Sequence, residues 1–344
     1  MKKLHLSTIN SIFIKNCNMK LVSFLFIFII SQTITAQFYK KAEPFTHTYS
    51  IVARDSVTGD MAVAVQSHWF SVGSVVTYGK AGVGVVATQS LVNPSYGPKG
   101  LTLMEQGLSP EQALNALLQN DAGEMFRQVA FLNNDGSVAT HTGSKCIDEA
   151  GHRQGENFSV QANMMLNNTV WDAMAIAFES AKGDLSQRVL AALKAAENEK
   201  GDIRGKQSAA ILIVKGEATG NSWEDVVMDL RVEDHENPIQ ELERLIKIHK
   251  AYDFMNKGDL AMEVGDTKEA ENLYLEAQKL FPDNLEMKYW YAINLLNNKD
   301  FNKAFPILKT IFNRDKNWKT LTKRLVKSGL LTIAEKKLAE VMQL

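Results

Sequence analysis

The sequence changes character near Pro238, and this change restricts the fold more than any other feature. Upstream of it, short apolar runs of strand length are separated by turn-forming stretches and a few helical segments. Downstream, apolar residues recur at helical spacing and no segment is typical of a strand. A chain of 344 residues is long enough for more than one domain. We therefore expect a mixed domain over residues 48–235 and an all-α domain over residues 236–344.

The expected strands of the first domain come in groups and do not alternate singly with helices. Residues 49–54 and 61–66 flank a turn-forming stretch and indicate a hairpin. Ser109-Pro110-Glu111-Gln112 is typical of a capped helix start. Further strands are predicted at 72–78, 82–88, 126–132, 137–141, 158–165, 208–214 and 226–232, with helices at 169–182 and 185–199. This order favours an α+β fold with mainly antiparallel sheets, for example two packed sheets with helices outside.

The second domain contains a pattern typical of tetratricopeptide repeats. Residues 251–284 carry the small, aromatic and proline residues that this repeat requires, namely Gly258, Ala270, Tyr274, Ala277 and Pro282. A weaker second copy follows over residues 285–318. Such helix pairs commonly dock a protein partner. Because three or more repeats are usually needed for stability, the alternative is a structural cap packed on the first domain.

The first 36 residues have the order of a secretory signal. Met19-Lys20 is basic, residues 21–30 are apolar, and residues 31–36 are small and polar, which predicts cleavage after Ala36. The apolar run is shorter than the roughly 20 residues of a membrane span. We therefore expect an upstream extension and signal peptide over residues 1–36 and a leader over residues 37–47. The protein would be exported, periplasmic or secreted, with no stable membrane span after cleavage; the alternative is an uncleaved anchor.

Charge and metal-ligand patterns exclude several classes of function. Lys and Arg number 38 against 39 Asp and Glu, so the chain lacks the basic excess typical of nucleic-acid binding. The two cysteines are Cys17, in the export segment, and Cys146, so the exported chain would keep one and form no internal disulfide. The seven histidines show no zinc-binding spacing, and we expect neither a metal nor a cofactor.

Several blocks of the first domain resemble one family. They are residues 48–55 (TYSIVARD), 64–68 (AVQSH), 82–89 (GVGVVATQ), 93–97 (NPSYG), 141–143 (HTG), 151–152 (GH), 158–163 (FSVQAN) and 207–210 (QSAA). Together they are similar to the domain-of-unknown-function family 1028, which is assigned to the N-terminal-nucleophile hydrolase-like superfamily. The resemblance covers about residues 48–235 and implies a four-layer α-β-β-α sandwich, but no settled reaction. The helical tail resembles a region that follows this domain in many members and is sometimes assigned to peptidoglycan binding.

The superfamily resemblance implies Thr48 as the catalytic residue. In these hydrolases the first residue of the processed chain supplies both the nucleophile and, through its α-amine, the base. An α-amine titrates at about 7.7–8.0 and can accept a proton near neutral pH. Cleavage after Ala36 would leave Gln37 first, so catalysis needs a second cut between His47 and Thr48, which Thr48 could make itself. The alternative is that Thr48 only starts a strand.

Seven further residues are candidates for the site. Lys80 resembles the lysine that lowers the proton affinity of the nucleophile in proteasome-like relatives, although a lysine in a Gly-rich turn is often simply solvated. Ser67 and His68 end the second expected strand. Polar side chains in apolar strands could hold a substrate or an oxyanion, or could satisfy one another in the core; these are Gln66, Gln89 and Asn163, together with Gln161.

The sequence therefore supports two functional hypotheses. The first is an exported amidohydrolase or peptidase of the N-terminal-nucleophile type, acting on a small amide, a peptide or a cell-wall fragment. The second is a catalytically silent module of the same fold that binds a ligand or a protein, with the helical tail as a docking surface. Because sheet-rich hydrolase-like folds often pair, a homo-oligomer is also expected.

Overall fold

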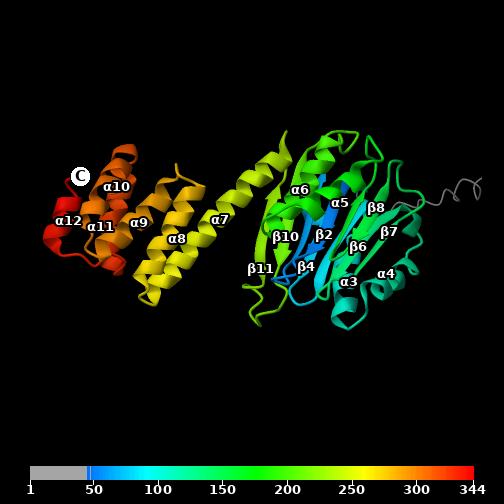
Figure 1. Cartoon of the computed structure of the whole chain (residues 1–344), viewed down its shortest axis with the longest axis horizontal. Helices are drawn as coiled ribbons and strands as arrows, with labels where there is room; N and C mark the ends of the chain where they lie inside the picture. The colour runs from blue at the N-terminus through cyan, green and yellow to red at the C-terminus, as the bar shows by residue number, and fades with distance from the viewer. Residues whose placement is uncertain (1–44, 47) are drawn as a thin grey trace, which may run out of the picture. The chain divides into compact units, whose positions relative to one another are not determined.

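The computed structural model describes residues 45–46 and 48–344 (Figure 1). The predicted signal peptide, its cleavage point and residues 37–44 and 47 of the leader lie outside these described residues. Within the described part of the chain, no helix is both long enough and apolar enough to cross a bilayer.

Strands and helices are mixed up to residue 232, and only helices follow. The strands are β1 Phe45–Thr46, β2 Thr48–Arg54, β3 Met61–Ser67, β4 Thr77–Lys80, β5 Gly84–Leu91, β6 Arg127–Asn133, β7 Val138–Thr142, β8 Gly151–Gly155, β9 Phe158–Ala162, β10 Ser208–Val214 and β11 Val226–Val232. The helices among them are α2 Gly73–Val76, α3 Tyr96–Glu105, α4 Pro110–Leu118, the 3₁₀ turn η1 Glu124–Phe126, α5 Val170–Ser180 and α6 Leu185–Asn198. The helices that follow are α7 Pro238–Glu263, α8 Thr267–Leu280, α9 Leu285–Asn297, α10 Phe301–Arg314, α11 Asn317–Ser328 and α12 Glu335–Val341.

The strands form two antiparallel sheets. Sheet A has the order β1-β5-β6-β7, with β4 also paired to β5, and sheet B has the order β11-β10-β3-β2-β9-β8. Neighbouring strands in both sheets are paired antiparallel. The predicted mixture of helices with antiparallel sheets is therefore confirmed.

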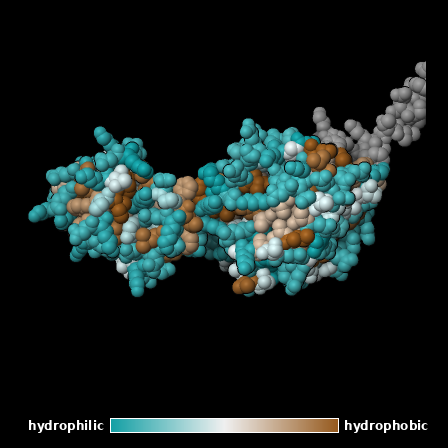
Figure 2. All heavy atoms as spheres, turned by 45° about the horizontal axis from the view of Figure 1, so that its top comes forward, coloured by the Kyte–Doolittle hydropathy of each residue, from teal (hydrophilic) through white to brown (hydrophobic). Residues whose placement is uncertain are grey.

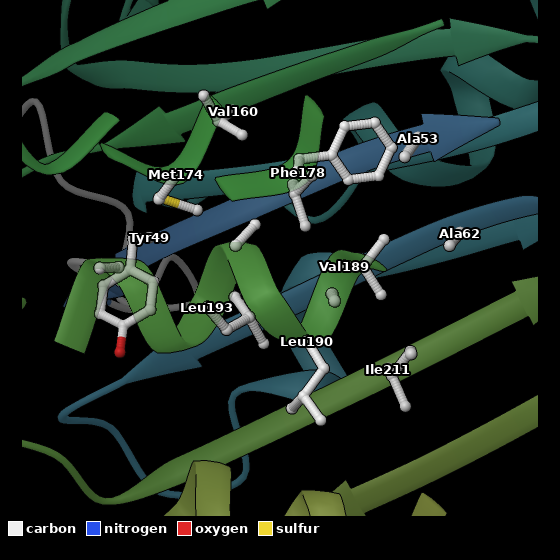
Figure 3. Close-up of a cluster of buried hydrophobic side chains, with 14 of the residues drawn as sticks. Tyr49, Ala53, Ala62, Val160, Met174, Phe178, Val189, Leu190, Leu193 and Ile211 are labelled. Carbon is white, nitrogen blue, oxygen red and sulfur yellow. The ribbon is translucent and has the colours of Figure 1, made fainter. Parts of the chain in front are cut away.

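Each sheet has one face against helices and one face against the other sheet. Apolar residues of α5 and α6 pack on sheet B, as Figure 3 shows for Met174 and Leu193 near Tyr49 of β2 and for Phe178 near Ala53. Helices α3 and α4 pack in the same way on sheet A. The facing sides of the two sheets share a third apolar cluster that includes Val63.

Alternation along β2 and β3 fixes which side chains face the other sheet. Tyr49, Ile51 and Ala53 belong to the cluster beneath α5 and α6, whereas Val52 belongs to the cluster between the sheets. Because successive side chains of a strand point to opposite faces, Thr48 and Ser50 lie on the same side as Val52 and face sheet A.

The strand predicted at residues 72–78 is wrong in its first half, which is the short helix α2. Val72 and Val76 are both buried because their spacing of four places them on one side of a helical turn. Gly73 lets this turn approach β10 closely, since a Cβ there would lie 2.5 Å from Cβ of Ala210. Tertiary packing thus overrides the β-propensity of the valines. The capping box predicted at Ser109 and Gln112 is present.

The helical region packs around small residues, as the repeat pattern requires. Ala270, Tyr274 and Ala277 of α8 are buried. A Cβ at Gly258 of α7 would lie 2.6 Å from Cε1 of Tyr274, so the two helices can approach only with glycine at this position. Pro282 follows the end of α8, where the chain leaves the helix.

The core beneath α6 gives a direct test of the packing. Leu193 is completely buried on α6, whereas Ile176 on α5 is 57% exposed. We expect Leu193→Ala to lower the free energy of unfolding by about 2–5 kcal/mol, because it leaves a cavity. The matched change Ile176→Ala should alter it by no more than about 0.5 kcal/mol. Urea unfolding followed by circular dichroism measures both, and equal effects would contradict this packing.

Candidate functional site

Three hydroxyl residues lie side by side where β2, β3 and β10 meet. Thr48 is paired with Ser67, and Ser67 is paired on its other side with Ser208. Directly opposed residues share a face of the sheet, so all three face sheet A. Each is completely buried. We call Thr48, Ser67 and Ser208 the hydroxyl row.

The chain changes sheets immediately before the hydroxyl row. Strand β1 belongs to sheet A, where Phe45 and Thr46 pair with Leu91 and Ser90, whereas Thr48 belongs to sheet B. Thr48 is therefore the first described residue of sheet B after the strand β1 of sheet A. Ser90 has a φ of +73°, a conformation uncommon for residues other than glycine, at the point where β1 joins β5.

Buried amide side chains hold the main chain of Thr48. The carbonyl oxygen of Thr48 accepts hydrogen bonds from Gln89 Nε2 at 3.1 Å and from the backbone N–H of Asn163 at 3.1 Å. Gln89 Nε2 and Asn163 Nδ2 also donate to Gln128 Oε1, at 2.7 and 2.9 Å. Gln128 of β6 thus connects Gln89 of β5 with Asn163, which directly follows β9, around the first residue of β2.

The same hydrogen bonds continue along the space between the sheets. Ser50 Oγ donates to Gln89 Oε1 at 2.6 Å and accepts from Gln161 Nε2 at 2.6 Å. All of these side chains are completely buried. We call Ser50, Gln89, Gln128, Gln161 and Asn163 the amide network. Its members form hydrogen bonds with one another and with the backbone. The polar side chains thus satisfy one another in the core, which was the alternative to direct binding of a substrate. Their geometry suits them to positioning Thr48.

The structure separates Gln66 and His68 from Ser67. Gln66 shares a face with Ala62 and Ala64, which belong to the cluster beneath α5 and α6, so it points away from sheet A. Gln66 is completely buried, and neither its Nε2 nor its Oε1 has a hydrogen-bond partner among the described residues. His68 is exposed, and its backbone N–H donates to Asp202 Oδ2 at 3.2 Å.

The structure does not bring Lys80 to Thr48. Lys80 pairs with Gly84 at the start of β5, whereas Gln89, near its end, contacts Thr48. Five residues of strand correspond to about 16 Å. The Lys80 ammonium, with half of its side chain exposed, lies 2.6 Å from Glu105 Oε1. The lysine role implied by the family resemblance has no support from this geometry.

The sequence analysis missed Gln128, Ser208 and the ion pair of Arg127 with Asp121. Arg127 is 2% exposed; its Nε donates to Asp121 Oδ2 at 2.8 Å and its Nη1 to the carbonyl of Leu91 at 2.7 Å. A polar residue inside an otherwise apolar strand was the available signal for Gln128, as it was for Gln89. Within the described residues, no group of three or more His, Cys, Asp or Glu side chains could hold a metal ion.

Gln128 should be the least replaceable member of the amide network. Gln128→Leu removes the acceptor shared by Gln89 and Asn163 and leaves their amides buried without it. Each unsatisfied group costs about 1–3 kcal/mol, so we expect the free energy of unfolding to fall by at least about 2 kcal/mol. Gln154→Leu, on the exposed part of β8, is the matched control and should be nearly neutral. Urea unfolding measures both variants. Equal losses of unfolding free energy in Gln128→Leu and Gln154→Leu would contradict the importance of the network.

The Asp121–Arg127 pair predicts a dependence of stability on pH. Burial acts to raise the pKa of the Asp121 carboxyl, but hydrogen bonds from Arg127 and the Gly123 N–H outweigh it and lower the pKa to about 2. The ionised carboxylate thus stabilises the fold above its ordinary pKa of 3.8, and this contribution is lost as the pH falls towards 2. We expect Asp121→Asn to be less stable than the natural chain by about 1–3 kcal/mol near neutral pH. The difference in free energy of unfolding between the natural chain and Asp121→Asn should become smaller as the pH falls from 3.8 to 2, as measured by urea titrations. A difference that stays constant over this range would contradict the stabilising role of the ionised Asp121 carboxylate.

Solved structures similar to this chain include one from Silicibacter pomeroyi and one from Yersinia bercovieri. The crystal structure of a protein from Silicibacter pomeroyi, described by the family model DUF1028, shares 32% identity with a TM-score of 0.53 and covers 58% of this chain and 88% of that chain. Anbu (ancestral beta-subunit) from Yersinia bercovieri shares 13% identity with a TM-score of 0.30, covering 63% of this chain and 97% of that chain. No curated protein matches the chain.

Family models match both parts of the chain. A tetratricopeptide repeat model matches residues 261–325, in agreement with the repeat pattern of the helical region. The model of the Family of unknown function (DUF1028) matches residues 48–242, beginning at Thr48 itself. The chain belongs to the Family of unknown function (DUF1028).

Proposed function

We propose that this protein is an exported amide-bond hydrolase that uses Thr48 as an N-terminal nucleophile on a small amide, a peptide or a cell-wall fragment. The observation that carries the proposal is the environment of Thr48. A hydroxyl residue begins β2 between two sheets, beside Ser67 and Ser208, and its carbonyl is held by Gln89 and Asn163. A nucleophile fixed in this way loses little freedom on reaction.

The arrangement of the sheets supports the same class of fold. Two facing antiparallel sheets, with α3 and α4 against one and α5 and α6 against the other, fit the α-β-β-α sandwich of N-terminal-nucleophile hydrolases. In that fold the nucleophile begins a strand at the meeting of the two sheets, which is where β2 begins.

The proposed chemistry starts with a cut between His47 and Thr48. The Thr48 hydroxyl then attacks the carbonyl carbon of the substrate amide, and the α-amine accepts the hydroxyl proton. The carbon–nitrogen bond breaks as the amine returns this proton to the leaving nitrogen. Water then hydrolyses the ester on Thr48 and regenerates the hydroxyl. The amide network would fix the main chain of Thr48 throughout, while Ser67, paired directly with Thr48, borders the reacting hydroxyl.

The helical region would recruit a protein partner. Its match to a tetratricopeptide repeat supports this role. Leu260 and Val264 of the α7 end are 61% and 81% exposed, and hydrophobic residues reach the surface in small groups on the face seen in Figure 2. Exposed apolar groups of this kind are typical of docking surfaces.

The test of the nucleophile is the mature N-terminus together with a substitution at Thr48. Intact mass and N-terminal sequencing of the exported protein should give a chain that begins at Thr48. Thr48→Ala should keep residue 47 attached and should lower kcat/KM on peptidyl aminocoumarin amides by about a thousandfold or more. Thr48→Ser retains a hydroxyl and should preserve the cut.

The matched control for this experiment is Thr58→Ala, in the exposed turn after β2, which should change neither the N-terminus nor the rate. A natural chain that keeps residue 47 and hydrolyses none of the amides would contradict the nucleophile. The α-amine would then be an amide without basicity, and the silent binding module would be the better description.

A further inference from the structure

A cavity lies at the far end of the β2–β3 hairpin from Thr48. It has a volume of about 800 Å³ and is bordered by the turn that joins these strands, the start of α6, the β10–β11 hairpin and the middle of α7. Thr48 and Arg54 are the two ends of β2, roughly 20 Å apart along a strand of this length. The cavity is therefore separate from the hydroxyl row, and its size is within the range of small-molecule sites.

The floor of the cavity is apolar. Leu185, Ile213 and Met228 line it and are 5%, 3% and 4% exposed. Val57 and Val226 on its rim are 92% and 48% exposed, which is unusual for aliphatic side chains that serve only the fold. A ligand with an apolar body would cover both the floor and these rim residues.

Most of the charged groups around the cavity already have partners. Asp184 pairs with Lys250, and Asp253 pairs with Lys257 at 2.7 Å. Asp55 accepts the N–H groups of Val57 and Thr58, which hold the pKa of its carboxyl below its ordinary value in spite of burial. These groups frame the cavity and are not available to a ligand without breaking an existing contact.

Asp60 and Lys215 differ from these paired groups in that their charges are not engaged in ion pairs with other described residues. Asp60 immediately precedes Met61, and Lys215 immediately follows Val214; since Met61 is paired with Val214, the two charged residues lie opposite each other at the cavity edge. Neither forms an ion pair with a described residue. Asp60 Oδ1 accepts a hydrogen bond from the backbone N–H of Gly216 at 3.4 Å. The Asp60 carboxylate and the Lys215 ammonium group thus lie together next to an apolar floor, while the other carboxylate of the lining that forms no ion pair with a described residue, Glu224, accepts a hydrogen bond from Asn221 Nδ2 at 3.2 Å.

We propose that this cavity binds a zwitterionic α-amino acid with a large apolar side chain. The ligand's ammonium group would bind the Asp60 carboxylate, its carboxylate would bind the Lys215 ammonium group, and its side chain would rest on Leu185, Ile213 and Met228. An α-amino acid carries an ammonium group and a carboxylate group on the same carbon, which matches two oppositely charged residues facing each other on neighbouring strands. The inference does not depend on Thr48 or on hydrolysis.

Helix α7 forms one wall of this site. His249, Lys250, Asp253 and Phe254 line the cavity from α7. Further along the same helix, Met255 belongs to the apolar core of the helical region. A bound amino acid would therefore contact the sheet and the first helix of the repeat region together.

The experiment is isothermal titration calorimetry of the full chain with L-leucine, L-phenylalanine, N-acetyl-L-leucine and L-leucinamide. The free amino acids should bind, and either capped leucine should bind at least about tenfold more weakly, because each loses one charge-assisted contact. This comparison varies only the ligand, so it stays informative if a protein variant fails to fold. Equal binding of free and capped leucine, or binding of none of the four, would overturn the proposal.

Three variants locate the site, and two controls accompany them. Asp60→Asn and Lys215→Met should each weaken L-leucine binding about tenfold, and capping the matching ligand group should then cost little more. Val226→Trp should block the cavity from its rim. The controls are Lys323→Met and Val326→Trp on α11, both at exposed positions, which should bind like the natural chain. Unchanged binding by the folded Asp60 and Lys215 variants would place the amino acid elsewhere and contradict the assignment.

Discussion

The hydrogen bonds of the buried amide network are the constraint on which the rest of this structure depends. Two sheets can pack face to face around glutamine and asparagine only if every amide finds a partner, since an unsatisfied buried group costs about 1–3 kcal/mol. Gln128 meets this requirement by accepting from Gln89 of its own sheet and from Asn163 beside the other. The network therefore fixes how sheet A lies on sheet B and, through the Thr48 carbonyl, where β2 begins.

This constraint also explains why the candidate site lies at one end of the sheets. Apolar residues such as Val52 and Val63 fill the space between the sheets at one end, and polar residues fill it at the other. The polar end contains the hydroxyl row and the crossing of the chain from β1 to β2. A rigid, dry environment of fixed dipoles is the kind of setting in which a hydroxyl can be positioned for reaction without reorganising its surroundings.

Much of the fold could be predicted because local signals agreed with the final packing. The capping box at Ser109, the hairpin around residues 55–60 and the small residues facing Tyr274 all depend on short-range spacing. The helical turn at Val72 depends on contact with β10, which no local pattern contains. The residues of the candidate site were harder to predict than the fold. Gln66 and Ser67 are neighbours in sequence but point to opposite faces of the sheet. The distance of Lys80 from Thr48 follows from the register of β4 on β5.

Helix α7 gives the molecule a mechanical property that its two family matches do not suggest separately. Its first half supplies Ile239 and Leu242 to the core beneath sheet B, and its second half supplies Ala251 and Met255 to the core of the helical region. A helix of 26 residues is an unbroken rod about 39 Å long. If a partner bound to the repeats changed the affinity of the cavity for the proposed ligand by some factor, linkage requires that this ligand change the affinity for the partner by the same factor.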